Sequence, residues 1–298
     1  MFISRLIPEK FMYKFRKTLI GRIIRAPYAQ LEIWYRHYRI VFGEKLGIPV
    51  PNSFVMKNEW LKTFERNPLI VSCSDKVLAK DYVRSKIGGE YIIPTIAVYG
   101  SADEIDFDKL PNKFVAKTNN SSGTNIICTD KSHADLASIR LKLDVWMKTR
   151  LNYGKRHYIW FYSKIVPKIL IEEFIESDTG DGLRDYKFWC FNGKPTYVWV
   201  DIDRYGKNKS RSIRNIDWSE LPMTLSTPRY LGDLKKPENY DLMVELARKL
   251  SADFKLVRVD LYNVKGKIYF GELTFASGDL IFNPPVYDKI WGERVRID

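Results

Sequence analysis

Two carboxylates and an arginine lie in two apolar runs near the C-terminus. Arg258 and Asp260 belong to the first run, and Glu272 belongs to the second. A tight turn at Lys265-Gly266 would pair the runs as antiparallel strands, whose alternation can place all three side chains on one face. The two carboxylates could then bind Mg²⁺ and, through it, phosphate oxygens, while Arg258 neutralises charge on a transferred phosphoryl group. A simple salt bridge between Arg258 and one acid is the open alternative.

A lysine followed by small polar residues forms a second candidate site. Lys117 ends the apolar run 113–118, and Asn119–Thr124 separates it from another apolar run. This pattern predicts a β-hairpin with a long tip, whose backbone N–H groups could surround phosphate oxygens. The tip lacks the spacing of a P-loop or of a dinucleotide-binding glycine motif. An ordinary polar hairpin tip therefore remains an alternative.

A third group of charged residues lies between these two. Glu172 and Glu173 are adjacent in the apolar run 169–176, and strand alternation sends one of them inward. Lys187 lies near the start of the next predicted strand.

Helices mixed with strand hairpins must position these residues. We expect strands at 69–73, 113–118, 126–129, 169–176, 186–192, 195–203, 255–264 and 267–274, and an extended segment at 91–99. Helices are expected at 58–64, 132–151 and 240–254, from Ser74 or Asp75 to Gly88, and through most of 1–45, with a polar turn or short helix at 103–110. This mixture predicts an α+β fold rather than a regular βαβ repeat.

Composition is that of a folded protein with one strongly basic region. The 298 residues are 45% hydrophobic and 29% charged, with a net charge of +13. Residues 1–50 contain ten Lys/Arg against three Glu, a net charge of +7, and 11–25 has apolar residues at helical spacing. This segment could lie on an anionic membrane or dock on the protein's own core. No nucleic-acid motif accompanies the charge, so we expect no nucleic-acid partner.

Cysteine and histidine usage argues against disulfides and zinc. The cysteines Cys73, Cys128 and Cys190 lie far apart, and no histidine has metal-ligand spacing. This usage is typical of a reducing cytosol. We therefore expect a cytoplasmic protein, with peripheral attachment to the inner face of the plasma membrane as an option.

Taken in order, the motifs resemble the ATP-grasp superfamily, and specifically its TupA-like branch, which is named after teichuronopeptide synthesis. The segments that carry the resemblance are "FDKLPNKFVAKTNNSSG", "IEEFIE", "DYKFWCFNG", "DWSELP", "VRVDLY…GKIYFGELTF" and "NPPVYDKIWG". The resemblance covers about 70–298. It implies an ATP-grasp fold in which two α+β subdomains enclose the nucleotide, preceded by the basic helical segment. The implied parts are an N-terminal segment 1–70, a pre-grasp region 71–112, a lid with adenine hinge 113–176, and a C-terminal subdomain with the magnesium site 177–298.

The resemblance also implies roles for individual residues. Lys117 would contact the phosphates of ATP, and Asn119, Ser121, Ser122, Gly123 and Thr124 would close over them. Glu172 and Glu173 would begin the adenine hinge, and Glu176 would reach the ribose. Lys187 would approach the terminal phosphate, Arg258 would stabilise the transition state, and Asp260, Glu272 and, weakly, Thr274 would hold Mg²⁺.

Two positions depart from the family pattern. Many ATP-grasp enzymes have Asn where this chain has Thr274, a weaker metal ligand, so a neighbour such as Asp279 could substitute. The loop Asn119–Gly123 lacks a His and a Gly that TupA-like relatives usually have.

The implied activity is an ATP- and Mg²⁺-dependent carboxylate–amine ligase that modifies a bacterial surface polysaccharide such as capsule or O-antigen. Its partners would be a carboxylate-bearing sugar and an amine. Asp201, Asp203, Arg204 and Arg211 are candidates for contacting this substrate, although they could equally lie in a solvated loop. A sugar kinase, a glycosyltransferase using the Asp201-Ile-Asp203 pair, and a non-catalytic binding protein are the alternatives.

Overall fold

The computed structural model describes residues 52–150, 154, 159–177, 182–203, 206, 208–278 and 280–297. The chain divides into two units, Met1–Pro51 and Asn52–Asp298. The first unit lies outside the described residues, and with it the predicted basic helices and the predicted membrane-binding segment 1–25. The fold below is that of the second unit.

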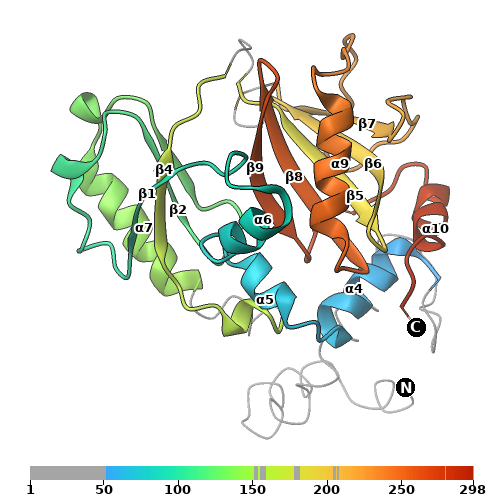
Figure 1. Cartoon of the computed structure of the whole chain (residues 1–298), viewed down its shortest axis with the longest axis horizontal. Coiled ribbons are helices and arrows are strands. Elements are labelled where there is room, and N and C mark those ends of the chain that lie inside the picture. Colours follow the sequence, from blue (N-terminus) through green and yellow to red (C-terminus); the bar gives the residue numbers. More distant parts are fainter. Residues whose placement is uncertain are drawn as a thin grey trace, which may run out of the picture. The chain divides into compact units, whose positions relative to one another are not determined.

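A small antiparallel sheet carries the Lys117 hairpin. Its strands are β1 (Thr95–Tyr99), β2 (Phe114–Thr118), β3 (Asn125–Cys128) and β4 (Ile169–Glu173), in the order β1-β4-β2-β3. Helix α7 (Leu136–Arg150) packs against this sheet (Figure 1). Ile139 and Leu143 of the helix share a buried core with Phe114 and Ile171, which fixes the face that β2 turns toward the helix. Lys117 therefore points away from this core.

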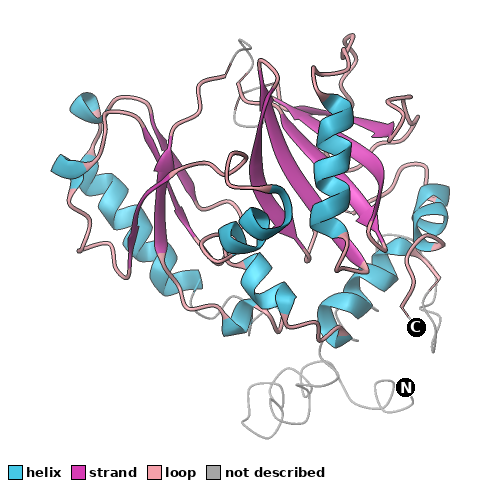
Figure 2. Cartoon of the chain, viewed as in Figure 1, coloured by secondary structure: helices cyan, strands magenta, loops and turns pink. Residues whose placement is uncertain are grey.

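A larger antiparallel sheet carries the acidic hairpin. Its strands are β5 (Asp185–Phe191), β6 (Lys194–Ile202), β7 (Ser210–Asn215), β8 (Leu256–Val264) and β9 (Lys267–Thr274), in the order β7-β6-β5-β8-β9. Helix α9 (Tyr240–Ser251) lies across one face (Figures 1 and 2). Its side chains Met243, Leu246 and Leu250 pack on apolar residues of β5, β6 and β8. Because side chains alternate along a strand, the polar residues of these strands collect on the other face.

Aromatic rings fill one end of that other face. Helices α4 (Phe54–Phe64) and α10 (Val286–Gly292) contact each other there. Trp291 stacks on Tyr197 with ring centroids 4.2 Å apart, and Trp189 lies 4.8 Å from Trp199. Phe54 is fully buried and meets the edges of Trp189 and Trp291 at 5.2 and 5.4 Å. The apolar end of the sheet is thereby closed.

Two further helices lead into the small sheet. They are α5 (Leu69–Ser74) and α6 (Ala79–Ile87), and short 3₁₀ turns occur at Phe107–Lys109, Lys131–His133 and Tyr162–Lys164.

The strand predicted at 69–73 is wrong, because this segment is helix α5. A short apolar run does not distinguish a strand from a buried helix by its periodicity. Ile70 and Cys73 are both buried at helical spacing, and Asn67 accepts a hydrogen bond from the N–H of Leu69 at the helix start. The hairpins predicted at 186–203 and 255–274, with turns at Asn192-Gly193 and Lys265-Gly266, are confirmed.

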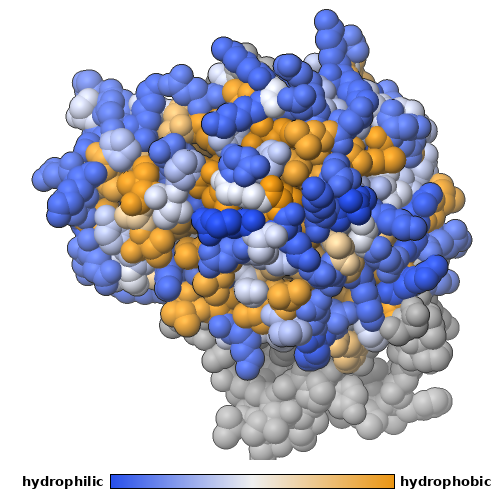
Figure 3. All heavy atoms as spheres, viewed as in Figure 1, coloured by the Kyte–Doolittle hydropathy of each residue, from blue (hydrophilic) through white to orange (hydrophobic). Residues whose placement is uncertain are grey.

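Hydrophilic side chains and separate hydrophobic patches share the face of the molecule shown in Figure 3. Among the described residues, no helix is long and apolar enough to cross a bilayer. The three cysteines are buried and unbridged.

The ring cluster around Phe54 predicts a large cost for its removal. We expect Phe54→Ala to lower the free energy of unfolding by about 3–5 kcal/mol, because a cavity would open among four aromatic rings. Denaturant unfolding followed by tryptophan fluorescence measures this. Phe64→Ala is the matched control: its ring lies on the same helix but is 44% exposed, so we expect about 1 kcal/mol or less. Equal losses would contradict the packing described.

Candidate active site

The acidic hairpin places Asp260 directly opposite Glu272 and Arg258 directly opposite Thr274. Arg258 binds both oxygens of Asp260 at 2.7 Å through Nε and Nη2. Nη2 also lies 3.3 Å from Oε1 of Glu272 and 3.1 Å from Oγ1 of Thr274. Both carboxylates therefore share one face with the guanidinium, as predicted. Regular alternation from the turn at Lys265-Gly266 would have paired Asp260 with Gly271, and a register shift between Asp260 and Leu261 brings Glu272 opposite Asp260 instead. The alternative salt bridge is present too, and it is part of the same cluster.

Lys187 reaches this cluster from the neighbouring strand β5. Its Nζ donates to Oδ2 of Asp260 at 2.7 Å and to Oδ2 of Asp185, and it lies 4.0 Å from Oδ2 of Asp201. The lysine and all three acids are buried. Burial opposes the charge on Arg258, but Asp260 and Glu272 outweigh it and raise the pKa of the guanidinium. Arg258 therefore stays charged.

A cluster of lysines faces the acids from the small sheet and from α6. Glu172 binds Lys80 at 2.6 Å through Oε1 and binds Lys117 through Oε2. Alternation places Glu172 and Glu173 on opposite faces of β4; its first four residues are all buried, and only Glu173, the last residue of the strand, is exposed. Burial disfavours the ionised form of Glu172, yet the charges of Lys117 and Lys80 win and hold its pKa below the usual range.

Lys76 connects the two halves of the site. Its Nζ donates to the carbonyl oxygen of Ser121 at 2.5 Å and lies 3.9 Å from Oε2 of Glu272. Burial, with help from the positive charge of Lys117, lowers the pKa of Lys76. An anion bound here would relieve this cost by pairing with both ammonium groups.

The loop after Lys117 divides into a buried part and an exposed part. Asn119 is fully buried: its side-chain amide donates to Oδ2 of Asp75 and to the carbonyl of Val166, and accepts from the N–H of Lys168. The hydroxyls of Thr118, Ser121 and Thr124 bond one another at 2.7–3.0 Å. Ser122 and Gly123 are exposed. Asn119 and Thr124 thus support the loop, and its tip faces outward.

A pocket joins the lysines, the loop and the acids. Its walls include Lys76, Lys117, Ser121, Ser122, Gly123, Asp260 and Glu272, together with Asn125, Tyr262 and Gly271. Six of the predicted nucleotide and metal residues are therefore brought together. Lys187 and Thr274 do not line this pocket. The hydroxyl of Thr274 donates a hydrogen bond to Oε1 of Glu272 at 3.1 Å.

A second hollow begins where β4 ends. It is lined by Glu90, Ile92, Pro94, the segment 173–176 and, from the large sheet, Val264, Lys267 and Tyr269, together with Gly89. Its mixture of apolar side chains and strand-end backbone suits a flat heteroaromatic ring. Glu176 lies at its edge, exposed and paired with Lys113.

Two of the predicted substrate residues, Asp201 and Arg211, lie opposite each other on β6 and β7 of the large sheet. Asp201 and Arg211 are buried and form an ion pair, with Nε 2.5 Å from Oδ1, and the guanidinium of Arg211 lies 4.6 Å from the ring of Trp199. Asp203 lies beyond the end of β6 with φ of 51° and accepts from the N–H of Asn208. Arg204 and Asp279 fall outside the described residues. Asp201 and Asp203 thus serve separate structural contacts, which argues against a metal-binding pair for a glycosyltransferase.

Sequence reasoning assigned no role to Lys76 and Lys80. The available signal is local: Asp75 accepts from the N–H groups of Val77 and Leu78 in the turn that contains Lys76, and Lys80 is the second residue of the helix that follows. Their proximity to Glu272 and Glu172 depends on tertiary structure.

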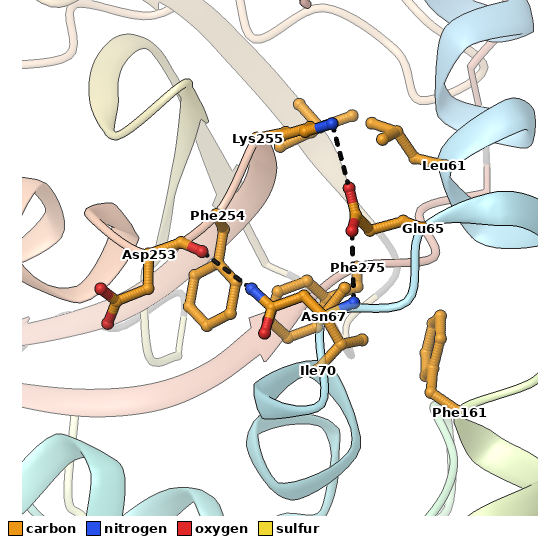
Figure 4. A pocket seen from close by; sticks show the side chains of 10 residues that line it. Leu61, Glu65, Asn67, Ile70, Phe161, Asp253, Phe254, Lys255 and Phe275 are labelled. Atoms are coloured by element: carbon orange, nitrogen blue, oxygen red, sulfur yellow. Dashed lines mark hydrogen bonds and ion pairs between the residues drawn. The ribbon is translucent and has the colours of Figure 1, made fainter. Parts of the chain in front are cut away.

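A third pocket shares no residue with the two above (Figure 4). Leu61, Ile70, Phe161 and Phe275 give it apolar walls. Its polar groups bond one another: Glu65 lies 3.6 Å from Lys255, and Asn67 donates to the carbonyl of Asp253 at 2.9 Å. It offers no cluster of cations to a phosphate.

The donor set fits magnesium but not a metal held by protein alone. Within the described ranges, no group of three His, Cys, Asp or Glu side chains could hold a metal ion. Magnesium commonly uses one or two carboxylates and completes its shell with waters and phosphates. Glu272 and Asp260 beside a pocket of lysines match that requirement.

The fold and the site define an ATP-grasp protein: two α+β halves, with lysines on the smaller sheet facing carboxylates on the larger. Residues 56–296 match the model of the TupA-like ATP-grasp family, and the chain belongs to this family. Both the family and the fold predicted from the sequence are confirmed. The comparison with curated proteins finds no match.

Among solved structures, D-alanine–D-alanine ligase from Bacillus anthracis complexed with ATP is similar at 18% identity, with a TM-score of 0.43, over 70% of this chain and 56% of that one. The Helicobacter pylori D-alanine–D-alanine ligase is 15% identical, with a TM-score of 0.44, over 78% and 64%. The ATP-grasp ligase PsnB complexed with minimal precursor, Mg and ADP is 10% identical, with a TM-score of 0.40, over 91% and 65%. This chain thus spans less than two thirds of each of these ligases.

The ion pairs of Glu172 predict a pH-dependent loss of stability. We expect Glu172→Gln to lower the free energy of unfolding at pH 7 by about 3–5 kcal/mol, because Lys80 and Lys117 lose their shared counter-charge. Since the folded-state pKa of Glu172 is depressed, its contribution is present above the unfolded value and is lost as pH falls through the folded value. The difference between wild type and variant should therefore shrink below about pH 4, in denaturant unfolding at several pH values. Glu173→Gln, its exposed neighbour, should change little at any pH.

Proposed function

We propose that this protein is an ATP- and Mg²⁺-dependent carboxylate–amine ligase that acts through an acyl phosphate. The observation that carries the proposal is the pocket in which Lys76 and Lys117 face Glu272 and Asp260. A polyanion bound between them would pair with the ammonium groups, and a divalent cation would join its phosphates to the acids. Family membership supports the same assignment.

The two hollows divide the nucleotide between them. Adenine would lie in the hollow lined by residues 173–176, where the chain continues beyond the end of β4 and its backbone N–H and C=O groups could contact the base. Glu176, at the edge of this hollow, is suited to binding a ribose hydroxyl. The triphosphate would extend into the lysine pocket, under Ser122 and Gly123. Tyr269 lines the first hollow and Gly271 the second, so β9 runs along both.

The residues of the chain supply charge and position. A substrate carboxylate oxygen attacks the γ-phosphorus, the bond to the β-phosphate oxygen breaks, and ADP leaves. An amine then attacks the acyl carbon, loses a proton and expels phosphate, which leaves an amide. Arg258 is fixed by Asp260, Ser277 and Thr274, so it can stabilise developing phosphoryl charge without reorganising. Magnesium would neutralise phosphate charge from the Glu272 side.

The loop 119–124 is suited to excluding water from this reaction. An acyl phosphate hydrolyses readily, so its site must be covered during turnover. The buried base of the loop is held by Asn119 and the three hydroxyls, while its exposed tip at Ser122 and Gly123 can close on a ligand. Gly123 has φ of 74°, a conformation that favours glycine.

For substrates we propose a uronic acid of a bacterial surface polysaccharide and an amino acid or amino sugar. The support is the polysaccharide association of the TupA-like branch, and the reaction would occur in the cytoplasm, where ATP is supplied. Attachment of residues 1–25 to an anionic membrane stays a prediction. A sugar kinase could use the same phosphate pocket with a hydroxyl in place of the carboxylate.

Product analysis tests this proposal. Purified protein would be incubated with MgATP, uronic acids and amines, and products followed by mass spectrometry and phosphorus NMR. We expect ADP, free phosphate and a new amide, all dependent on substrate and lost in Glu272→Ala. Phosphate retained on the sugar would instead establish a kinase. Failure to bind or turn over ATP under any condition would refute the assignment.

Direct binding tests the phosphate pocket separately. We expect Lys117→Met to weaken binding of a non-hydrolysable ATP analogue by roughly 10–100-fold, the value of one charge-assisted contact. Isothermal titration calorimetry measures this. Lys148→Met is the matched control, because Lys148 lies on α7, which packs against the same sheet, and its side chain is 74% exposed and pairs with Asp144 at the surface. A comparable loss in the control would argue against phosphate contact by Lys117.

A further inference from the structure

The side chain of Asn119 joins three separate segments of the chain. Asn119 is fully buried. Its amide donates to Oδ2 of Asp75 at 2.9 Å and to the carbonyl of Val166 at 3.0 Å, and its Oδ1 accepts from the N–H of Lys168 at 2.8 Å. Both donor hydrogens of this amide are used inside the protein, and none is left for a phosphate oxygen.

Asp75 connects this amide to the turn between α5 and α6. Its two carboxylate oxygens serve different segments of the chain. Oδ2 accepts from Asn119, whereas Oδ1 accepts from the N–H groups of Val77 and Leu78 at 2.8 and 3.3 Å. Asp75 is only 5% exposed, so water competes little for either oxygen. The turn is thereby fixed against the base of the loop 119–124.

Lys76, the next residue in this turn, is tied to the same loop through both its backbone and its side chain. Its backbone N–H donates to the carbonyl of Asn119 at 3.1 Å, and its Nζ donates to the carbonyl of Ser121 at 2.5 Å. A lysine ammonium is carried on a flexible four-carbon stem, so its position is defined only where the backbone beneath it is held. The bridge between Asp75 and Asn119 holds that backbone.

We propose that Asp75 and Asn119 are positioning residues, which hold the ammonium of Lys76 where it meets the phosphates of the nucleotide. This inference rests on the proposed nucleotide binding. Lys76 and Ser121 line the phosphate pocket, whereas Asp75 and Asn119 do not. Because the bridge already holds the lysine, binding of a polyanion does not have to order its backbone, and the affinity is correspondingly higher.

Calorimetric titration with a non-hydrolysable ATP analogue and Mg²⁺ tests the bridge from each end. Asn119→Ala removes the amide without changing the charge. Asp75→Ser keeps a short acceptor for the N–H groups that follow it but cannot reach Asn119. We expect each variant to weaken binding roughly tenfold. Asp75→Ser also removes a negative charge next to Lys76, which alone would strengthen binding of a polyanion. Unchanged or tighter binding by either folded variant would therefore overturn the inference.

The same titrations in a Lys76→Met background separate positioning from a general structural role. If Asn119 acts through the lysine, Asn119→Ala should weaken binding by less than about twofold once the ammonium is absent. A further tenfold loss in that background would refute the inference while leaving the proposed function intact. Failure of the wild type to bind the analogue would instead count against the proposed function itself.

Adenosine provides a second readout, because it would occupy only the hollow lined by residues 173–176. We expect its affinity to be the same in the wild type, Asn119→Ala and Asp75→Ser. A parallel loss of adenosine binding would show general damage to the site and would overturn the assignment to Lys76.

Arg140→Met is the matched control. Arg140 lies on α7 and donates to the carbonyls of Ala102 and Ile105, so it also ties separate segments together beside the small sheet. It lines neither the phosphate pocket nor the hollow at 173–176. We expect lower stability with unchanged affinity for the analogue, and a tenfold loss of affinity here would contradict the specific role of the bridge. If circular dichroism shows that Asn119→Ala is unfolded, Asp75→Ser decides.

Discussion

Closely spaced positive charges must be neutralised before this site can exist. Lys80 and Lys117 are held together by the single buried carboxylate of Glu172, and Arg258 and Lys187 are held by Asp260. Unpaired charges buried in this way would cost several kcal/mol each. The internal ion pairs therefore allow several positively charged side chains to lie close to one pocket. The rest of the structure holds these side chains in position.

The face of the large sheet opposite helix α9 holds the charged side chains in position. One end is closed by tightly packed rings, including Trp189 and Trp199, and the other carries the charges. The two ends touch, because Arg258 lies 5.9 Å from the ring of Trp189 and Arg211 lies 4.6 Å from that of Trp199. Rigid aromatic packing beneath a guanidinium limits its rotamers, which favours a preorganised site.

Much of the fold follows from local sequence. The hairpins at 186–203 and 255–274 combine alternating apolar residues with Asn-Gly and Lys-Gly turns, and both form as expected. Segment 69–73 does not, because a short apolar run fits a strand or a buried helix equally well. Strand β7 (Ser210–Asn215) was not predicted, because its charged residues are typical of a solvated loop. In the structure Arg211 of this strand is neutralised by Asp201 of the neighbouring strand.

The sequence by itself determined that the two strands pair through the turn at Lys265-Gly266 and that Arg258 and Asp260 share a face. Regular alternation from that turn would pair Asp260 with Gly271, and only the register shift between Asp260 and Leu261 sets Glu272 opposite Asp260. It also predicted that one of Glu172 and Glu173 faces inward, and the structure decided that this one is Glu172. Tertiary structure alone decided that Lys76, in the turn between α5 and α6, would lie 3.9 Å from Glu272, and that Lys187 would turn to Asp185 and Asp260. Local pattern fixes direction along one strand, whereas distance between strands and helices far apart in the chain is fixed by how their apolar faces pack.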